Sequence, residues 1–168
     1  TNLDMRLDNP TGFGKHPDLC VVENIIPYGE NDYFIYGTFD TVVRDVTCIE
    51  VNKIFRYNKA TNTVTALGQS AKGVADGEIH KVIVTPSGDM FVVGSFTAAG
   101  GVANTACIAK YNPGADTWSS VSSGITGLGA GYPEIFDVEY ASDDRIYVSG
   151  KFATIDDLGT LPFEGIAR

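Results

Sequence analysis

The stretch "FVVGSFTAAGG", residues 91–101, has the composition of a buried β-strand but holds a glycine, Gly94, near its middle. A glycine inside a strand weakens it, because it packs no side chain and its backbone loses more freedom on folding. The chain repeats the feature: "YFIYGTF" contains Gly37 and "RIYVSGKF" contains Gly150, each two residues before a phenylalanine. The glycines are 57 (94 − 37) and 56 (150 − 94) residues apart. We therefore infer three copies of one structural repeat.

The residues that precede each glycine keep the same register without a gap. Apolar residues stand fifteen and twelve positions before the glycine in every copy: Val22, Ile79 and Ile135, then Ile25, Val82 and Val138. A fixed period of this size is typical of propellers, solenoids and repeat arrays.

The composition is that of a globular protein rich in strands. Of the 168 residues 43% are hydrophobic and 20% charged, and the 19 glycines occur among frequent Val, Thr, Tyr and Phe. The net charge of −9 argues against nucleic acid as a partner, since binding phosphates requires clustered Lys and Arg. No segment approaches the roughly 18 apolar residues of a transmembrane helix. The chain begins at Thr1 without an initiator Met, so we expect a processed protein or a fragment.

The three cysteines, Cys20, Cys48 and Cys107, lack C-x-x-C spacing, so we expect no metal site and no cofactor. Two interpretations stay open: Cys20 pairs with Cys48 in an oxidising compartment, or all three are small buried or half-buried thiols.

Each period holds four strand signals separated by turns. In the central repeat they cover residues 79–85, 90–96, 106–112 and 117–123, and helical periodicity is absent throughout. Four antiparallel strands in about 56 residues is the pattern of a β-propeller blade. The predicted fold is all-β, and we expect Gly94 and Phe96 to be core residues.

The central repeat resembles the repeat of kelch-like propellers, in particular the bacterial delta-sixty type and its eukaryotic cortical-marker relatives. The matching positions are Gly94, Phe96, Gly100, Gly101, Ile108, Ala109, Lys110, Tyr111 and Trp118. The resemblance covers all three periods, but residues 41–51 and 154–165 depart from it. It implies a propeller of the kind found in cell-surface and secreted proteins.

The phase of the repeats predicts blades at 22–77 and 78–133, an incomplete blade at 134–168, and the end of a preceding blade at 1–21. Three blades do not close a ring of roughly four to eight. We therefore expect either further blades of the same polypeptide or self-association of two copies.

Variable loops on a rigid repeat are where binding is expected. From each repeat glycine to the matching Arg or Lys of the third strand is 19, 16 and 18 residues, so these connections vary most. The candidate binding residues are Arg44, Asp45, Asp156 and Asp157 in these connections, and Tyr132, which could stack on a sugar or peptide.

Catalytic signatures are scarce. There are two histidines, no G-x-S-x-G elbow and no calcium-loop spacing, and His80 aligns with Phe136, which favours a structural role. The predicted function is a non-enzymatic scaffold or recognition module of a cell-surface, secreted or virion protein that binds protein or glycan. The alternatives are a structural subunit of a filament or virion, and a fragment of a propeller hydrolase or oxidase.

Overall fold

The computed structural model describes residues 6–8, 20–44, 47–69, 71–121, 125–126, 133–142, 145–152, 154–155 and 166–167. All regular structure in these residues is β, and no helix occurs among them, which confirms the predicted all-β class. The chain divides into two compact units, Thr1–Val74 and Ala75–Arg168. Each is described by itself.

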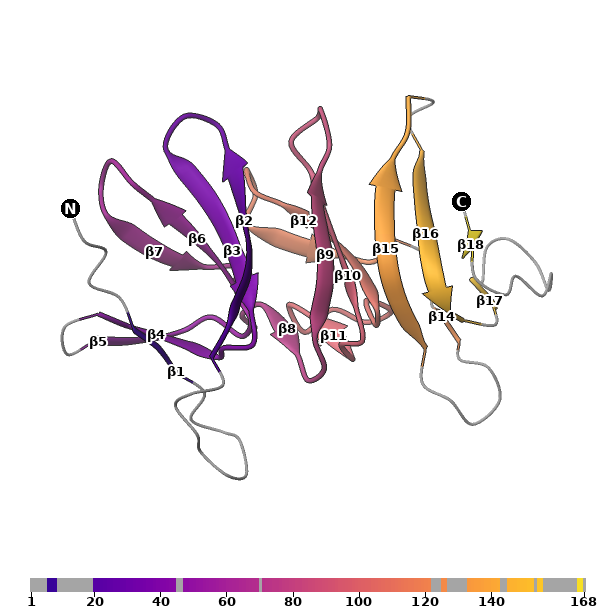
Figure 1. Cartoon of the computed structure of the whole chain (residues 1–168), viewed down its shortest axis with the longest axis horizontal. Helices are drawn as coiled ribbons and strands as arrows, with labels where there is room; N and C mark the ends of the chain where they lie inside the picture. The colour runs from indigo at the N-terminus through magenta and orange to yellow at the C-terminus, as the bar shows by residue number, and fades with distance from the viewer. Residues whose placement is uncertain are drawn as a thin grey trace. The chain divides into compact units, whose positions relative to one another are not determined.

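The first unit contains two antiparallel sheets (Figure 1). The larger has the order β2-β3-β6-β7, with β2 at Val22–Tyr28, β3 at Asp32–Gly37, β6 at Ile54–Asn58 and β7 at Thr63–Ala66. The smaller has the order β1-β4-β5, with β1 at Arg6–Asp8, β4 at Thr41–Arg44 and β5 at Thr47–Glu50. The connection from the second to the third strand of this repeat thus forms a hairpin of its own. A two-residue strand, β8 (Val74–Ala75), lies at the unit boundary.

The second unit repeats the plan. A four-stranded antiparallel sheet has the order β13-β12-β10-β9, with β9 at Ile79–Val84, β10 at Met90–Gly94, β12 at Ile108–Asn112 and β13 at Thr117–Ser119. A three-stranded sheet has the order β15-β16-β18, with β15 at Glu134–Tyr140, β16 at Ile146–Lys151 and β18 at Ile166–Ala167. The short strands are β11 (Ala98–Ala99), β14 (Ile125–Thr126) and β17 (Thr154–Ile155). Strands β9 and β15, the first of their repeats, lie side by side (Figure 1).

The first hairpin of every repeat has one register and one irregularity. The repeat glycine pairs with the residue fifteen positions earlier, as Val22↔Gly37, Ile79↔Gly94 and Ile135↔Gly150, and the register then shifts by one residue at a β-bulge. At this bulge the two backbones approach closely. A Cβ atom on Gly94 would lie 2.0 Å from the carbonyl oxygen of Glu78, and the corresponding distances at Gly37 and Gly150 are 1.9 and 2.1 Å. The glycine is required because no side chain fits against the neighbouring main chain.

The phenylalanine two positions after each glycine is fully buried, in the core of its unit. Phe39 packs among Ile35, Val42, Val51 and Phe55, and its ring centre lies 5.4 Å from that of Phe55. Phe152 belongs to the cluster formed by Val93, Cys107, Ile108, Ile135, Val138 and Val148. The expectation that Gly94 and Phe96 are core residues is confirmed by the burial of Phe96 and the packing of Gly94.

A polar network joins the second and third strands in the first two repeats. In the first, Asp32 accepts hydrogen bonds from Arg56 Nη2 at 2.7 Å and from Asn58 Nδ2 at 2.8 Å. In the second, Lys110 Nζ lies 2.8 Å from Asp89, and Asn112 Nδ2 donates to Asp89 at 3.1 Å. The Arg/Lys-Tyr-Asn motif of the third strand therefore holds an aspartate across the sheet. Its role in these sheets is structural.

This network predicts how stability falls in acid. The hydrogen bond from Arg56 lowers the pKa of Asp32, and that from Lys110 lowers the pKa of Asp89, both below the ordinary value of 3.8. Because the folded protein then binds fewer protons than the unfolded chain, this stabilisation is present above pH 3.8 and is lost as the pH falls through the folded pKa values. We expect the free energy of unfolding, measured with urea from about pH 7 to about pH 2, to fall less steeply in the D32N/D89N double variant. Equal slopes would contradict the assignment.

Candidate functional site

Of the five predicted binding residues, Arg44 lies within the described part of the chain. It ends β4, is half-buried, and its guanidinium donates to the backbone carbonyl of Asn62 in the turn between β6 and β7. This hydrogen bond links the hairpin of β4 and β5 to the larger sheet. Asp45, Tyr132, Asp156 and Asp157 lie outside the described residues.

A pocket of about 430 Å³ opens at the strand ends of the second unit. Its walls come from three segments far apart in sequence: the residues that follow β10, those that precede β12, and the residue before β15. The lining side chains are Ser95, Phe96, Thr97, Ala106, Cys107 and Pro133. The connection between the second and third strands, which was predicted to bind, therefore meets at this pocket the connection into the next repeat, which holds the candidate Tyr132 in sequence.

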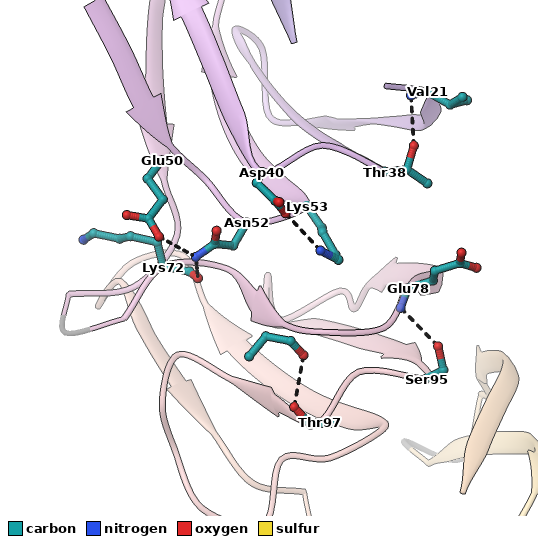
Figure 2. Close-up of polar contacts among 11 residues, drawn as sticks. Val21, Thr38, Asp40, Glu50, Asn52, Lys53, Lys72, Glu78, Ser95 and Thr97 are labelled. Carbon is teal, nitrogen blue, oxygen red and sulfur yellow. Dashed lines mark hydrogen bonds and ion pairs between the residues drawn. The ribbon is translucent and has the colours of Figure 1, made fainter. Parts of the chain in front are cut away.

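Hydroxyl groups fix the rim of the pocket. Ser95 Oγ accepts a hydrogen bond from the amide of Glu78 at 3.1 Å. Thr97 Oγ1 lies 3.3 Å from the carbonyl oxygen of Ala75 and 3.2 Å from Asp76 Oδ2. The first repeat has the same arrangement at the equivalent of Ser95, where Thr38 Oγ1 accepts from the amide of Val21 at 3.0 Å (Figure 2). These hydroxyls hold the segment after the repeat glycine against the preceding strand.

The backbone around the pocket is common to the first two repeats. The amide of Cys107 donates to the carbonyl of Phe96 at 3.0 Å, as the amide of Lys53 does to that of Phe39 at 2.7 Å. Both Cys107 and Lys53 have a positive φ, 63° and 72°. Position 107 in the second repeat therefore corresponds to position 53 in the first.

The side chains at these equivalent positions differ. In the first repeat Lys53 Nζ pairs with Asp40 Oδ1 at 3.0 Å, and the two side chains are only 16% and 14% exposed (Figure 2). In the second repeat the same two positions are Cys107 and Thr97, which are shorter and uncharged, and both line the pocket. A long side chain with its ion partner occupies in one repeat the position at which a cavity opens in the other.

Cys107 is buried in the pocket wall, and its thiol is unreactive. Its Sγ lies 3.1 Å from the carbonyl oxygen of Pro133. Burial, with a smaller contribution from the charge of Glu134, raises the pKa of the Cys107 thiol to about 11. The thiol is therefore neutral at physiological pH and supplies a small apolar surface rather than a nucleophile. All three cysteines are free thiols, and Cys48 is exposed.

The difference in burial between Cys48 and Cys107 predicts selective alkylation. Because the thiolate is the reacting species, iodoacetamide at about pH 8 should modify the exposed Cys48 and leave Cys107 unmodified, and modification of Cys107 should rise only as the pH approaches about 11. Peptide mass spectrometry of the native protein measures both, with the urea-unfolded protein as the control in which all three react. Rapid modification of native Cys107 at the lower pH would contradict the burial.

A second group of ionisable residues lies where β9 and β15 run side by side. The Nδ1–H group of His80 donates to the carbonyl of Ile135 at 2.9 Å, and the His80 ring stacks on Phe136 with centres 5.9 Å apart. Lys81 pairs with Glu139 and, at 2.6 Å, with Asp137. The hydrogen bond from Lys81 lowers the pKa of Asp137, and the same hydrogen bond to Asp137 raises the pKa of Lys81. These contacts join adjacent repeats, which fits the structural role expected for His80.

The described residues contain no group of three His, Cys, Asp or Glu side chains that could hold a metal ion. They also contain no helix long and apolar enough to cross a membrane. No protein-family model matches the chain, and searches of curated proteins and of solved structures find no similar protein.

Sequence reasoning identified the connections that form the pocket but not the residues that line it. Ser95, Thr97, Ala106 and Cys107 attract no attention by type, since none is a usual catalytic or binding signature in this pattern. The signal was in the alignment of the repeats, where Lys53 corresponds to Cys107. A residue that changes from long and charged to short and apolar at a fixed position marks the place where the repeat opens.

Proposed function

We propose that the chain forms blades of a β-propeller and acts as a non-enzymatic recognition module of a cell-surface, secreted or virion protein. Supporting the propeller are the repeated four-stranded antiparallel sheets, the common bulged hairpin and the side-by-side packing of β9 and β15. Packing between the first strands of adjacent repeats is the kind of contact that places inner strands around an axis.

The observation that carries the recognition role is the strand-end pocket lined by Ser95, Phe96, Thr97, Ala106, Cys107 and Pro133. Small-ligand and side-chain pockets are concave and mostly apolar, with a few fixed polar groups at the rim. The apolar wall of Phe96, Ala106 and Pro133 with hydroxyls beside it suits an aliphatic side chain of a protein ligand better than a sugar. The ligand class we propose is therefore a protein segment that inserts an apolar side chain.

The test uses two small probes and the 168-residue chain. N-acetyl-leucinamide represents a peptide side chain and methyl α-glucoside represents a glycan. In NMR titrations we expect the leucine probe to shift the amide signals of Thr97, Ala106 and Cys107, and the glucoside to leave them unchanged. Equal shifts with the glucoside would favour a glycan ligand, and no shifts with either probe would contradict a binding role for the pocket.

Two variants link binding to the pocket. Ala106→Phe fills the pocket and should raise the Kd of the leucine probe at least about 10-fold, which corresponds to about 1.4 kcal/mol of binding free energy. Ala103→Phe places the same side chain at an exposed position of the same connection and should leave binding unchanged. The T97D/C107K double variant transfers the Asp40–Lys53 ion pair to this position and should abolish binding in the same way.

The alternative of a structural subunit in a larger assembly is favoured by a different observation. Val21, Val22 and Ile25, on or next to β2, are large apolar side chains with about half of their surface exposed. Exposed apolar patches of this kind mark interaction surfaces more often than isolated exposed residues do.

A further inference from the structure

The contact between the second and third repeats has two halves, both within the second unit. One half is the apolar side of β15, where Ile135 and Val138 are 0% exposed. They pack in one cluster with Val93 and Ile108 of the preceding repeat. This internal contact shows how one repeat of the chain covers the next.

The side of β2 that is equivalent to this buried side of β15 is exposed to solvent. Val22 and Ile25 stand fifteen and twelve residues before Gly37, as Ile135 and Val138 stand before Gly150. Their hairpins share one register and one bulge, so the positions are equivalent in structure as well. Yet Val22 is 42% and Ile25 is 53% exposed. A strand side that is buried in the third repeat is uncovered in the first.

The other surface of the internal contact, the side of the second repeat that faces β15, also has an exposed equivalent. It lies on β15 and β16 of the third repeat. In the second repeat the side that faces β15 carries Lys81, Ile83, Phe91 and Val93. The residues 56 positions later, at the spacing of the repeat glycines, are Asp137, Glu139, Tyr147 and Ser149. Together with Val148, these four residues line a hollow of about 160 Å³. The chain thus presents both halves of its own internal contact.

We propose that the apolar side of β2, centred on Val22 and Ile25, binds the hollow on β15 and β16 of a second copy of this chain. The contact is head-to-tail, because the two surfaces differ. It deepens the assembly alternative given above and does not depend on ligand binding at the strand-end pocket, so the two proposals fail separately. Asp137 and Ser149 replace Lys81 and Val93, so the contact between copies is more polar than the internal one and association is reversible.

The charges at the equivalent positions are compatible with this pairing. In the internal contact Lys81 meets Asp137 and Glu139. Between copies, Asp137 takes the place of Lys81, and Asn24 and Ile26 take the places of the two carboxylates. No like charges face each other at these positions.

The first measurement is sedimentation velocity of the 168-residue chain over a wide concentration range. We expect mass to rise with concentration, and Ile25→Glu to weaken association at least about 10-fold, since it sets a carboxylate against Asp137 and Glu139. Val121→Glu makes the same change at another exposed apolar residue and should have no effect. Asn24→Lys should strengthen association about 2- to 5-fold by facing Asp137, the range expected of an exposed ion pair.

The second measurement mixes two variants that each lose one half of the contact. Ser149→Glu blocks the hollow and Ile25→Glu blocks the β2 side, so neither variant should associate alone. Their mixture retains one intact pair of surfaces and should form a dimer and nothing larger. Circular dichroism confirms that both variants are folded.

Three outcomes would overturn the proposal. A wild-type chain that stays monomeric at all concentrations would mean that the β2 side is not covered by a second copy. Normal association of Ser149→Glu alone would mean that β2 pairs with another surface, such as a second β2. Failure of the mixture to dimerise, with both variants folded, would exclude the head-to-tail contact.

Discussion

Replacing Gly94 with alanine is expected to destabilise the protein by more than about 3 kcal/mol, at or above the upper end of the range for overpacked sites. The added methyl group would lie 2.0 Å from the carbonyl oxygen of Glu78, a distance that no real Cβ atom tolerates. The neighbour is backbone held by the bulge, so it cannot rotate away as a side chain would. Gly37→Ala and Gly150→Ala meet the same obstacle at 1.9 and 2.1 Å and should behave alike.

The matched control is Gly114→Ala. An added methyl group there approaches only the side-chain oxygen of Asn112, at 3.4 Å, and the backbone has no positive φ. Its effect on the free energy of unfolding should stay within about 0.5 kcal/mol. Urea denaturation compares the variants, and similar midpoints for Gly94→Ala and Gly114→Ala would refute the close approach of the two strands.

Replacing Phe39 with alanine is expected to lower the free energy of unfolding by about 3–5 kcal/mol. The side chain is fully buried and its ring packs at 5.4 Å on that of Phe55. Truncation leaves a cavity where the ring packs on Ile35 of β3 and Phe55 of β6, and the sheet cannot move to close it. Hydrogen exchange should show faster exchange of the amides in these two strands.

Phe136→Ala is the control for aromatic truncation. Phe136 is 46% exposed, and its stacking on His80 is an interaction at the surface. The expected loss is less than about 1 kcal/mol, since little area leaves contact with water on folding. A loss as large as that of Phe39→Ala would show that burial does not separate the two sites.

Much of the fold could be predicted because it depends on local patterns. The four strands expected in residues 78–133 form where alternation and turn residues placed them, and the glycine period marks the same hairpin three times. The motif residues Gly100 and Trp118 are explained by their contact with each other. Gly100 has a φ of 58°, and the Trp118 side chain lies where a Cβ atom would be.

The candidate site was less predictable, because it depends on residues brought together from distant segments. The connection between the second and third strands contributes residues to the pocket, but Arg44 is tied to the Asn62 carbonyl within its own unit. Whether Arg44 also meets a ligand stays a prediction. The pocket residues Thr97 and Cys107 are noticeable only beside their counterparts Asp40 and Lys53.

The sequence by itself determined the period, the four strands of the central repeat and the positions of the repeat glycines, because spacing and turn chemistry act over a few residues along the chain. The bulge that makes each glycine necessary became visible only in the structure. The tertiary structure decided where the repeat is open. A pocket exists at Cys107, whereas Lys53 occupies the equivalent position of the first repeat. Whether a side chain fills such a position depends on its length and on the neighbours that other strands place around it. Ile25 is exposed and Val138 buried, although both are apolar residues at one repeat position, because burial depends on whether an adjacent sheet covers the strand.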